Sequence, residues 1–162
     1  MSARRLLETY WDAALPVRPI AIADAMGVKV YRQSEMNETA IIERLPGRSH
    51  RVVVNANEPL LRMRFAVAHA IGHVVMGHLG PGGTHSDSLD HFHSDVRSPI
   101  ERAANEFALE LLIPEDALDV VLRKSNRMAE IATLFCVSEV ALSIRMKNLG
   151  ILPSARHALK MG

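Results

Sequence analysis

Two histidines, His69 and His73, lie four residues apart in an otherwise apolar stretch of the chain. If that stretch is a helix, both imidazoles lie on one face, with Cβ atoms roughly 5–6 Å apart. Imidazoles at this separation can share one metal ion, and imidazole suits zinc. The pair alone is weak evidence, because the same spacing is common in helices that bind no metal.

Three neighbouring features favour a metal site. The apolar surroundings would bury both imidazoles, and buried polar groups need partners. Gly72 lies between the histidines, where glycine costs a helix about 1 kcal/mol relative to alanine, so we expect a second helix to approach closely. That helix should carry Glu101 near its start and Asn105 one turn later. Its small residues Ala104 and Ala108 are expected to pack against Gly72.

Glu101 has two interpretations from spacing alone. Ser98 and Glu101 have the S-x-x-E spacing of a capping box, in which the glutamate folds back onto the backbone of Ser98. The same carboxylate is available as a third metal ligand. Residues 77–97 offer other candidates for that role, although histidines of a loop are expected to be solvent-exposed. These candidates are His78, His85, His91, His93, Asp87, Asp90 and Asp95.

The remaining pattern predicts an α+β protein in which helices dominate. A small sheet of about three strands is expected at 28–31, 40–43 and 51–55. The Gly-, Ser- and His-rich segment 77–97 has no period and is predicted to be one long loop. Helices are expected at 3–14, 20–26, 59–76, 98–113 and 114–123, followed by two in the tail with a break near Cys136 and a cap at Ser138.

Composition narrows the functional classes. Cys136 is the one cysteine, so an internal disulfide is excluded and a reducing compartment is favoured. The N-terminal segment has the pattern of an amphipathic helix rather than a signal peptide, and no apolar run has the length of a membrane span. We therefore expect a cytoplasmic protein. A net charge of +1 provides no general attraction to nucleic acid.

The C-terminal tail is locally basic. From Val120 onward, seven lysines and arginines are opposed only by Glu130 and Glu139. The pattern of two helices with a turn at Val137 and Ser138 resembles a helix-turn-helix, which makes direct DNA binding one hypothesis. Packing onto the rest of the protein is the favoured interpretation, because the second helix has few base-reading side chains. The apolar residues expected to pack are Ile131, Leu134, Phe135, Val140, Leu142, Ile144 and Leu149.

Two blocks together resemble one known family. Residues 64–73, RFAVAHAIGH, resemble the R-F-x-x-A-H-E-x-G-H core of the ImmA/IrrE metallopeptidases. Residues 101–108, followed by 111–114, resemble that family's E-x-x-A-N-x-F-A and L-L-x-P block. The resemblance covers nearly the whole chain and implies a zincin-like fold. We expect a metallopeptidase domain at 1–119 and a C-terminal helical subdomain packed on it at 120–162.

The resemblance implies a ligand set. By position, His69, His73 and Glu101 become the metal ligands, and Asn105 becomes a supporting residue behind them. This favours the ligand interpretation of Glu101 over the capping box. Zinc is the expected ion, although manganese or iron also suits these ligands.

Ala70 departs from the family pattern, because it replaces the glutamate that follows the first histidine. In zinc peptidases this glutamate takes a proton from the attacking water and passes it to the leaving amine. Its loss removes a contribution of roughly 10²–10⁴-fold, so the chain is expected to be inactive but to keep its metal. Ala70 is either an engineered inactivating change, which the intact ligands favour, or a feature of a natural pseudopeptidase.

The resemblance also implies a partner. Members of the family cleave or control helix-turn-helix repressors, so the expected substrate or partner is such a repressor or an antitoxin, as in stress responses and toxin–antitoxin systems. The strand at 51–55 is expected to pair with an extended substrate by β-augmentation. The alternatives are a binding protein that holds a repressor or peptide without cutting it, and a DNA-binding regulator.

Overall fold

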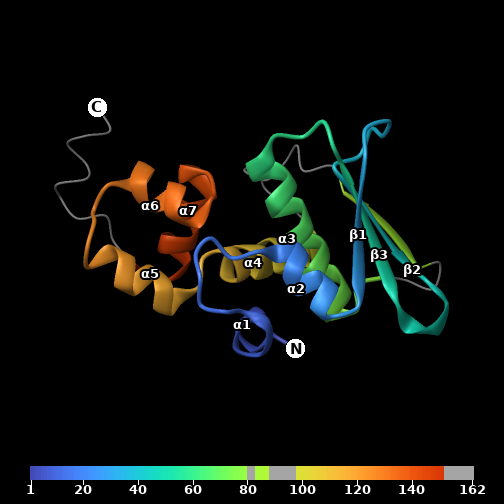
Figure 1. Ribbon diagram of the computed structural model, residues 1–162, viewed down its shortest axis with the longest axis horizontal. Coiled ribbons are helices and arrows are strands. Elements are labelled where there is room, and N and C mark those ends of the chain that lie inside the picture. Colours follow the sequence, from blue (N-terminus) through green and yellow to red (C-terminus); the bar gives the residue numbers. More distant parts are fainter. Residues whose placement is uncertain (80–82, 88–97, 152–162) are drawn as a thin grey trace.

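A computed structural model describes residues 1–79, 83–87 and 98–151 of the 162-residue chain. It confirms a helix-rich α+β fold with a small sheet (Figure 1). The helices are α1 (Ala3–Tyr10), α2 (Pro19–Ala25), α3 (Leu60–Met76), α4 (Pro99–Leu112), α5 (Glu115–Leu122), α6 (Met128–Phe135) and α7 (Glu139–Asn148), with a short 3₁₀ turn η1 (Pro46–Arg48). The strands are β1 (Val28–Gln33), β2 (Ala40–Arg44), β3 (His50–Asn55) and β4 (Thr84–Asp87).

The sheet has the strand order β1-β3-β2-β4. β1 runs parallel to β3, whereas β2 is antiparallel to both β3 and β4. The β-branched run of β3 alternates, so Val52 and Val54 are buried. Figure 1 shows the sheet at one end of the molecule and α5, α6 and α7 at the other, with α3 and α4 between them.

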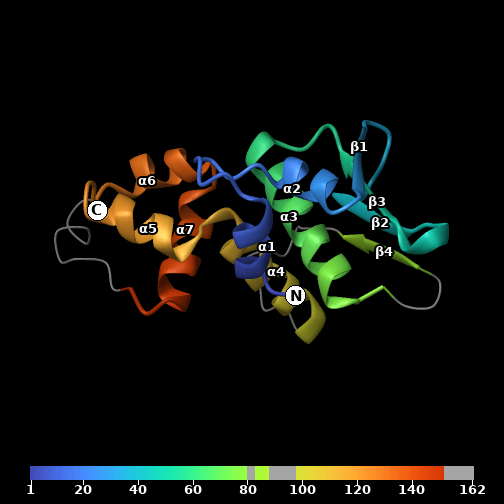
Figure 2. The same ribbon diagram turned by 60° about the horizontal axis from the view of Figure 1, so that its bottom comes forward.

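β4 corrects the expectation that residues 77–97 form one loop. Thr84 to Asp87 pair antiparallel with β2, with Ala40 opposite Asp87 and Glu43 opposite Thr84. Figure 2 shows this strand at the edge of the sheet, close to α3. The polar composition of this segment gives no local strand pattern. The strand forms because it pairs with β2, which lies some 40 residues earlier in the chain. Residues 80–82 and 88–97 of the expected loop, with His91, His93, Asp90 and Asp95, lie outside the described residues.

The expectation that the strand at 51–55 accepts a substrate is wrong. β3 is an interior strand, flanked by β1 on one side and β2 on the other. Its backbone hydrogen-bonding groups are therefore already paired, and no extended peptide can be added to it. In the part of the chain that the structure describes, β4 pairs only with β2, which leaves its other side as a sheet edge.

Gly72 allows α3 and α4 to pack closely. A Cβ at this position would lie 3.1 Å from Phe107 Cδ1 and 3.2 Å from Phe107 Cβ. The expected close approach of a second helix is thus confirmed. The three atoms nearest to that Cβ all belong to the Phe107 side chain, and the packing of Ala104 and Ala108 against Gly72 stays a prediction.

Arg64 ties α3 to two distant parts of the chain. Its guanidinium donates to the carbonyl of Val17 at 2.7 Å and to that of Cys136 at 3.1 Å. Cys136 has a left-handed φ of 53° and ends α6. Ser138 then caps α7 by accepting from the backbone N–H of Ala141, as predicted.

The C-terminal helix α7 packs on α4, but two apolar residues of the tail remain partly exposed to solvent. Arg145 of α7 donates from Nε to the carbonyl of Ile113 at 3.2 Å. Leu134 and Val140, which were expected to be buried, are about half exposed because they lie on the outer faces of α6 and α7. The predicted domain boundary between 119 and 120 stays a prediction, and α5 runs through it without a break.

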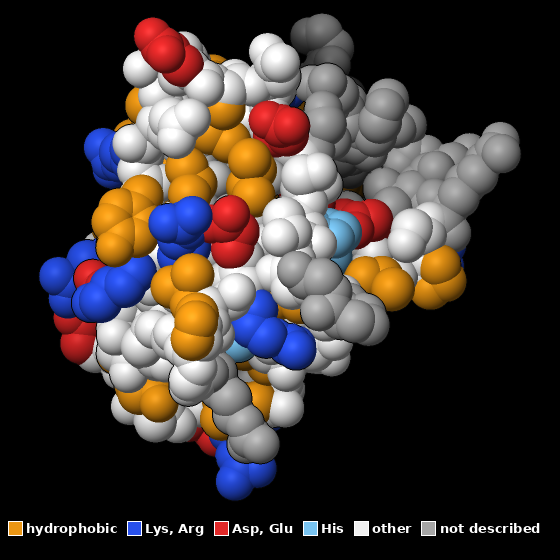
Figure 3. All heavy atoms as spheres, turned by 90° about the vertical axis from the view of Figure 1, so that its right-hand side faces the viewer, with side chains coloured by type: hydrophobic (Ala, Val, Ile, Leu, Met, Phe, Trp, Pro, Cys, Tyr) orange, Lys and Arg blue, Asp and Glu red, His pale blue; other side chains and the backbone are white. Residues whose placement is uncertain are grey.

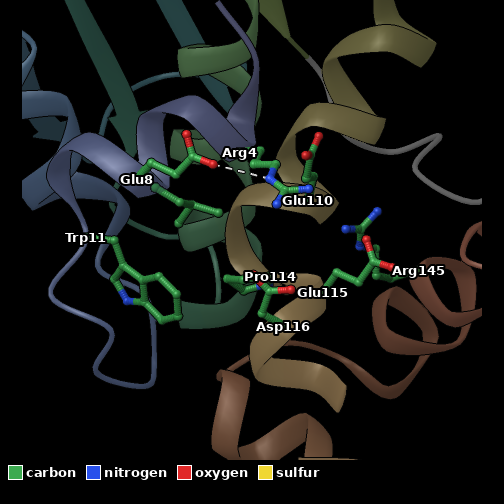
Figure 4. Close-up of a pocket in the computed structure, with 9 residues that line it drawn as sticks. Arg4, Glu8, Trp11, Glu110, Pro114, Glu115, Asp116 and Arg145 are labelled. Carbon is green, nitrogen blue, oxygen red and sulfur yellow. Dashed lines mark hydrogen bonds and ion pairs between the residues drawn. The ribbon is translucent and has the colours of Figure 1, made fainter. Parts of the chain in front are cut away.

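A cavity of about 300 Å³ separates α1 from the C-terminal helices (Figure 4). Arg4 and Arg145 line it together with carboxylates that include Glu110 and Glu115. Glu110 lies nine residues after Glu101, about 13 Å along α4, so this cavity is separate from the histidines. Among the described residues, no helix is long and apolar enough to cross a membrane.

Candidate metal centre

Three separate elements bring their polar side chains to one point. α3 contributes His69 and His73, both buried, from consecutive turns of the same face. The first turn of α4 contributes Glu101, and the last residue of β4 contributes Asp87. One ligand atom from each of these four residues lies within 4.8 Å of the other three.

The spacing of the predicted ligands suits a small divalent ion. His69 Nε2 lies 2.9 Å from His73 Nε2 and 3.1 Å from Glu101 Oε2. His73 Nε2 lies 3.5 Å from the same Glu101 oxygen. A tetrahedral site with bonds of about 2.0 Å separates neighbouring ligand atoms by about 3.3 Å, so these distances fit.

Glu101 does not form the alternative capping box. Ser98 is the N-cap of α4, but its side chain makes no capping hydrogen bond. The Glu101 carboxylate instead reaches His69 and His73. Of the two interpretations that spacing left open, the structure favours the ligand.

His78 stands behind His73. The Nδ1 atoms of these two residues lie 3.1 Å apart, so the outer nitrogen of His73 has a partner while its Nε2 points at Glu101. Such a bond fixes the tautomer and orientation of a ligating imidazole. The sequence offers His78 only as an alternative third ligand, whereas the structure places it against the outer nitrogen of His73.

Asp87 and His85, which the sequence offers only as alternative third ligands, also lie in the site. His69 Nε2 lies 3.3 Å from Asp87 Oδ2. His85 Nε2 lies 3.0 Å from Asp87 Oδ1 and 3.1 Å from Glu101 Oε1. The available signal was the His-x-Asp spacing, which puts both side chains on one face if the segment is a strand.

Ala70 and Asn105 complete the predicted set. Ala70 is fully buried on α3, next to His69, and brings no polar atom to the site. Among the described residues, the side-chain oxygen of Asn105 is buried without a hydrogen-bond partner, and so is Nδ1 of His69. A His69 that uses Nε2 as a ligand carries a proton on Nδ1, and the Asn105 oxygen is an acceptor of the matching kind. The supporting role of Asn105 stays a prediction.

Two carboxylates, Asp87 and Glu101, raise the pKa of the His69 and His85 imidazoles. Burial lowers the pKa of His69, but the Asp87 and Glu101 carboxylates outweigh it and raise the pKa to about 9. The same two carboxylates raise the pKa of His85 to about 10. Burial raises the pKa of Asp87, but His69 and His85 outweigh it and lower the pKa to about 2. Contacts with His69, His73 and His85 hold the pKa of Glu101 well below its usual range.

The donor set fits a metal. Two imidazoles and two carboxylates are ligands that zinc accepts, and a cation would compensate the buried negative charge. The site also reaches the surface, because the side chains of Glu101 and His85 are 28% and 24% exposed. Figure 3, a view onto the sheet end, shows a histidine and an acidic side chain side by side at the surface.

A small sheet beside a helix with two histidines, approached by a glutamate from the next helix, is the arrangement expected of a metallopeptidase-like domain. The chain belongs to the Peptidase_M78 family, described as the IrrE N-terminal-like domain, whose model matches residues 23–147. That match includes α3, α4 and β4, and it confirms the resemblance to the ImmA/IrrE family. A comparison with curated proteins finds no match.

Proposed function

We propose that this protein is a zinc-binding member of the ImmA/IrrE metallopeptidases that recognises a helix-turn-helix repressor or antitoxin in the cytoplasm and does not cleave it as the chain stands. The observation that carries the proposal is the convergence of His69, His73 and Glu101 from two helices, with ligand atoms 2.9–3.5 Å apart. The partner class follows from the family resemblance.

In such a site, bound zinc supplies a Lewis acid that polarises a peptide carbonyl and makes a water molecule more acidic. The residues of this chain would hold that ion in a fixed place: His69 and His73 as neutral donors and Glu101 as the charged one. His78 would keep the His73 ring oriented.

Ala70 is the reason for the proposed inactivity. The methyl side chain cannot accept a proton, and the α3 position after His69 is the one from which the family's glutamate acts. The proton-transfer contribution of roughly 10²–10⁴-fold would therefore be missing. Recognition of a partner does not depend on that carboxylate, so binding would persist.

The edge of β4 offers a place for an extended segment of the partner. Within the described residues, β4 has one neighbouring strand, β2, and Asp87 at its end belongs to the metal cluster. A peptide that added to this edge would receive main-chain hydrogen bonds beside the site.

Calorimetric titration of zinc into metal-free protein tests the proposal. We expect one tight site, and we expect Ala70→Glu to bind zinc equally well. Cleavage of a helix-turn-helix repressor by Ala70→Glu would show that Ala70 alone accounts for the inactivity. Ala70→Gln is the matched control, because it has the same size without a carboxylate. Absence of a stoichiometric zinc site would contradict the proposal. Cleavage by the unmodified chain would contradict the inactivity.

Direct DNA binding by α6 and α7 stays the second hypothesis. Arg145, one of its two cations on α7, is partly buried and donates to the carbonyl of Ile113. Lys147 remains exposed on the same helix. A DNA affinity that falls steeply with salt and with Lys147→Ala would favour this function.

A further inference from the structure

One carboxylate oxygen of Asp87 faces His69 without a well-aligned hydrogen bond among the described residues. The Asp87 side chain is only 6% exposed, and its Oδ2 atom has no hydrogen-bond partner among the described residues. His69 Nε2 is 3.3 Å away, yet the two atoms do not meet the geometry of a hydrogen bond. A metal ion between Oδ2 and the His69 nitrogen would pair with both of these buried groups.

The two carboxylates of the site are arranged alike. Glu101 directs Oε2 to His69 and lies 3.1 Å from His85 Nε2 through Oε1. Asp87 directs Oδ2 to His69 and lies 3.0 Å from the same His85 nitrogen through Oδ1. His85 thus contacts the outer oxygen of each carboxylate, and both inner oxygens converge on the histidine pair. This is the arrangement by which outer residues orient ligating carboxylates.

We propose that Asp87 is a fourth protein ligand, so that the centre is a closed site of two histidines, one glutamate and one aspartate. His85 is the positioning residue for both carboxylates. This inference rests on the proposed function, namely that the centre holds a metal at all. The four ligand atoms all lie within 4.8 Å of one another. Asp87 Oδ2 lies 3.3 Å from His69 Nε2, which matches the separation of about 3.3 Å between neighbouring ligands of a tetrahedral zinc site.

A closed site has a functional consequence. Structural zinc sites have four protein ligands, whereas catalytic sites leave one position for water or substrate. Asp87 would occupy that position, in the same chain in which Ala70 removes the base. The metal would then join β4 to α3 and α4, and it would stabilise the edge strand rather than carry out hydrolysis.

Cobalt substitution tests the fourth ligand without any activity assay. Visible absorption of the Co²⁺-loaded protein reports how many ligands surround the ion, and added azide reports whether a position is open. We expect the parent spectrum to be that of a four-coordinate ion and to ignore azide. Asp87→Ala should bind azide, and its zinc affinity should fall by roughly 100-fold.

Two further variants keep the test interpretable. Asp87→Asn preserves the shape of the side chain and an acceptor for His85, so it replaces Asp87→Ala if that variant does not fold. Ser86→Ala changes an exposed neighbour on the same strand and should leave the spectrum, the azide response and the affinity unchanged. Circular dichroism of each metal-free variant checks the fold.

The outcomes separate this inference from the proposed function. An azide response in the parent, with unchanged zinc affinity in Asp87→Ala and Asp87→Asn, would overturn the fourth ligand and leave the His69, His73 and Glu101 site intact. If the parent bound neither zinc nor cobalt stoichiometrically, the proposed function itself would fail, and the fourth ligand with it.

Discussion

His69 Nε2 lies 3.1 Å from Glu101 Oε2, although 32 residues separate the two along the chain. The contact joins the middle of α3 to the first turn of α4. It exists because Gly72 lets the two helices approach closely against Phe107. The meeting of the histidine and the glutamate therefore depends on the packing of Gly72 against Phe107, two residues that do not themselves bind a metal.

Removing the Glu101 carboxylate should nearly abolish metal binding. Glu101→Gln keeps the size of the side chain but removes the charge that compensates the ion, so zinc affinity should fall by at least about 100-fold. Titration of zinc by calorimetry measures the change. Glu106→Gln, on the exposed face of the same helix, is the matched control and should bind like the parent. Equal affinities in the two variants would remove Glu101 from the ligand set.

Metal binding should strengthen as the pH rises from 7 to 10. His69 has a pKa of about 9 in the metal-free site, and a ligating imidazole must be neutral, so zinc has to displace a proton. Calorimetry in buffers of different ionisation enthalpy measures that release. We expect about one proton or more per zinc at pH 7. A zinc affinity that does not change between pH 7 and pH 10 would contradict the raised pKa of His69.

The metal-free protein should show the opposite trend in stability. The pKa of His69 is raised from 6.5 to about 9 on folding, so its contribution to the free energy of unfolding is complete below pH 6.5 and is lost as the pH rises through 9. The pKa of Asp87 is lowered from 3.8 to about 2, so its contribution is present above pH 3.8 and is lost as the pH falls through 2.

Thermal unfolding with and without zinc measures this effect. We expect the midpoint of the metal-free protein to fall between pH 7 and pH 10, while that of the zinc-loaded protein does not follow it. A midpoint of the metal-free protein that rises over the same range would show that the folded state does not favour the protonated imidazoles.

His78 should contribute to metal affinity without being a ligand. Its Nδ1 lies 3.1 Å from Nδ1 of His73, so His78→Ala frees the ring of a ligand and should weaken zinc binding by roughly 10–100-fold. The Co²⁺ spectrum should keep its shape, because the set of ligands does not change. His50→Ala, which removes a histidine of β3, is the control. A changed spectrum in His78→Ala would make His78 a ligand.

Gly72→Ala should destabilise the protein despite the better helix propensity of alanine. The gain of about 1 kcal/mol expected from propensity is opposed by a contact of 3.1 Å with the Phe107 ring, for which overpacking costs typically 1–3 kcal/mol. We expect a net loss of about 1 kcal/mol in urea unfolding. In a Phe107→Leu background the loss should shrink, because the ring atom is gone. Stabilisation by Gly72→Ala alone would refute the close contact.

The local elements could be predicted from the sequence for local reasons. The apolar helix with His69 and His73 four residues apart, the strand at β3 and the Ser138 cap all depend on neighbours within a few positions. These patterns depend on backbone geometry and on the spacing of apolar and polar residues, both of which can be seen within one short segment of the chain. The family blocks then indicated Glu101 as the partner of the histidines.

Tertiary structure decided the rest of the site. Asp87 and His85 reach it because Thr84–Asp87 pairs with β2, and no pattern within that polar segment revealed a partner 40 residues away. The contact of Phe107 with Gly72 was not predicted for the same reason: which side chain meets a helix face depends on how two helices are set against each other. The sequence by itself determined which residues can bind a metal, and only the packing of three elements decided which of them meet.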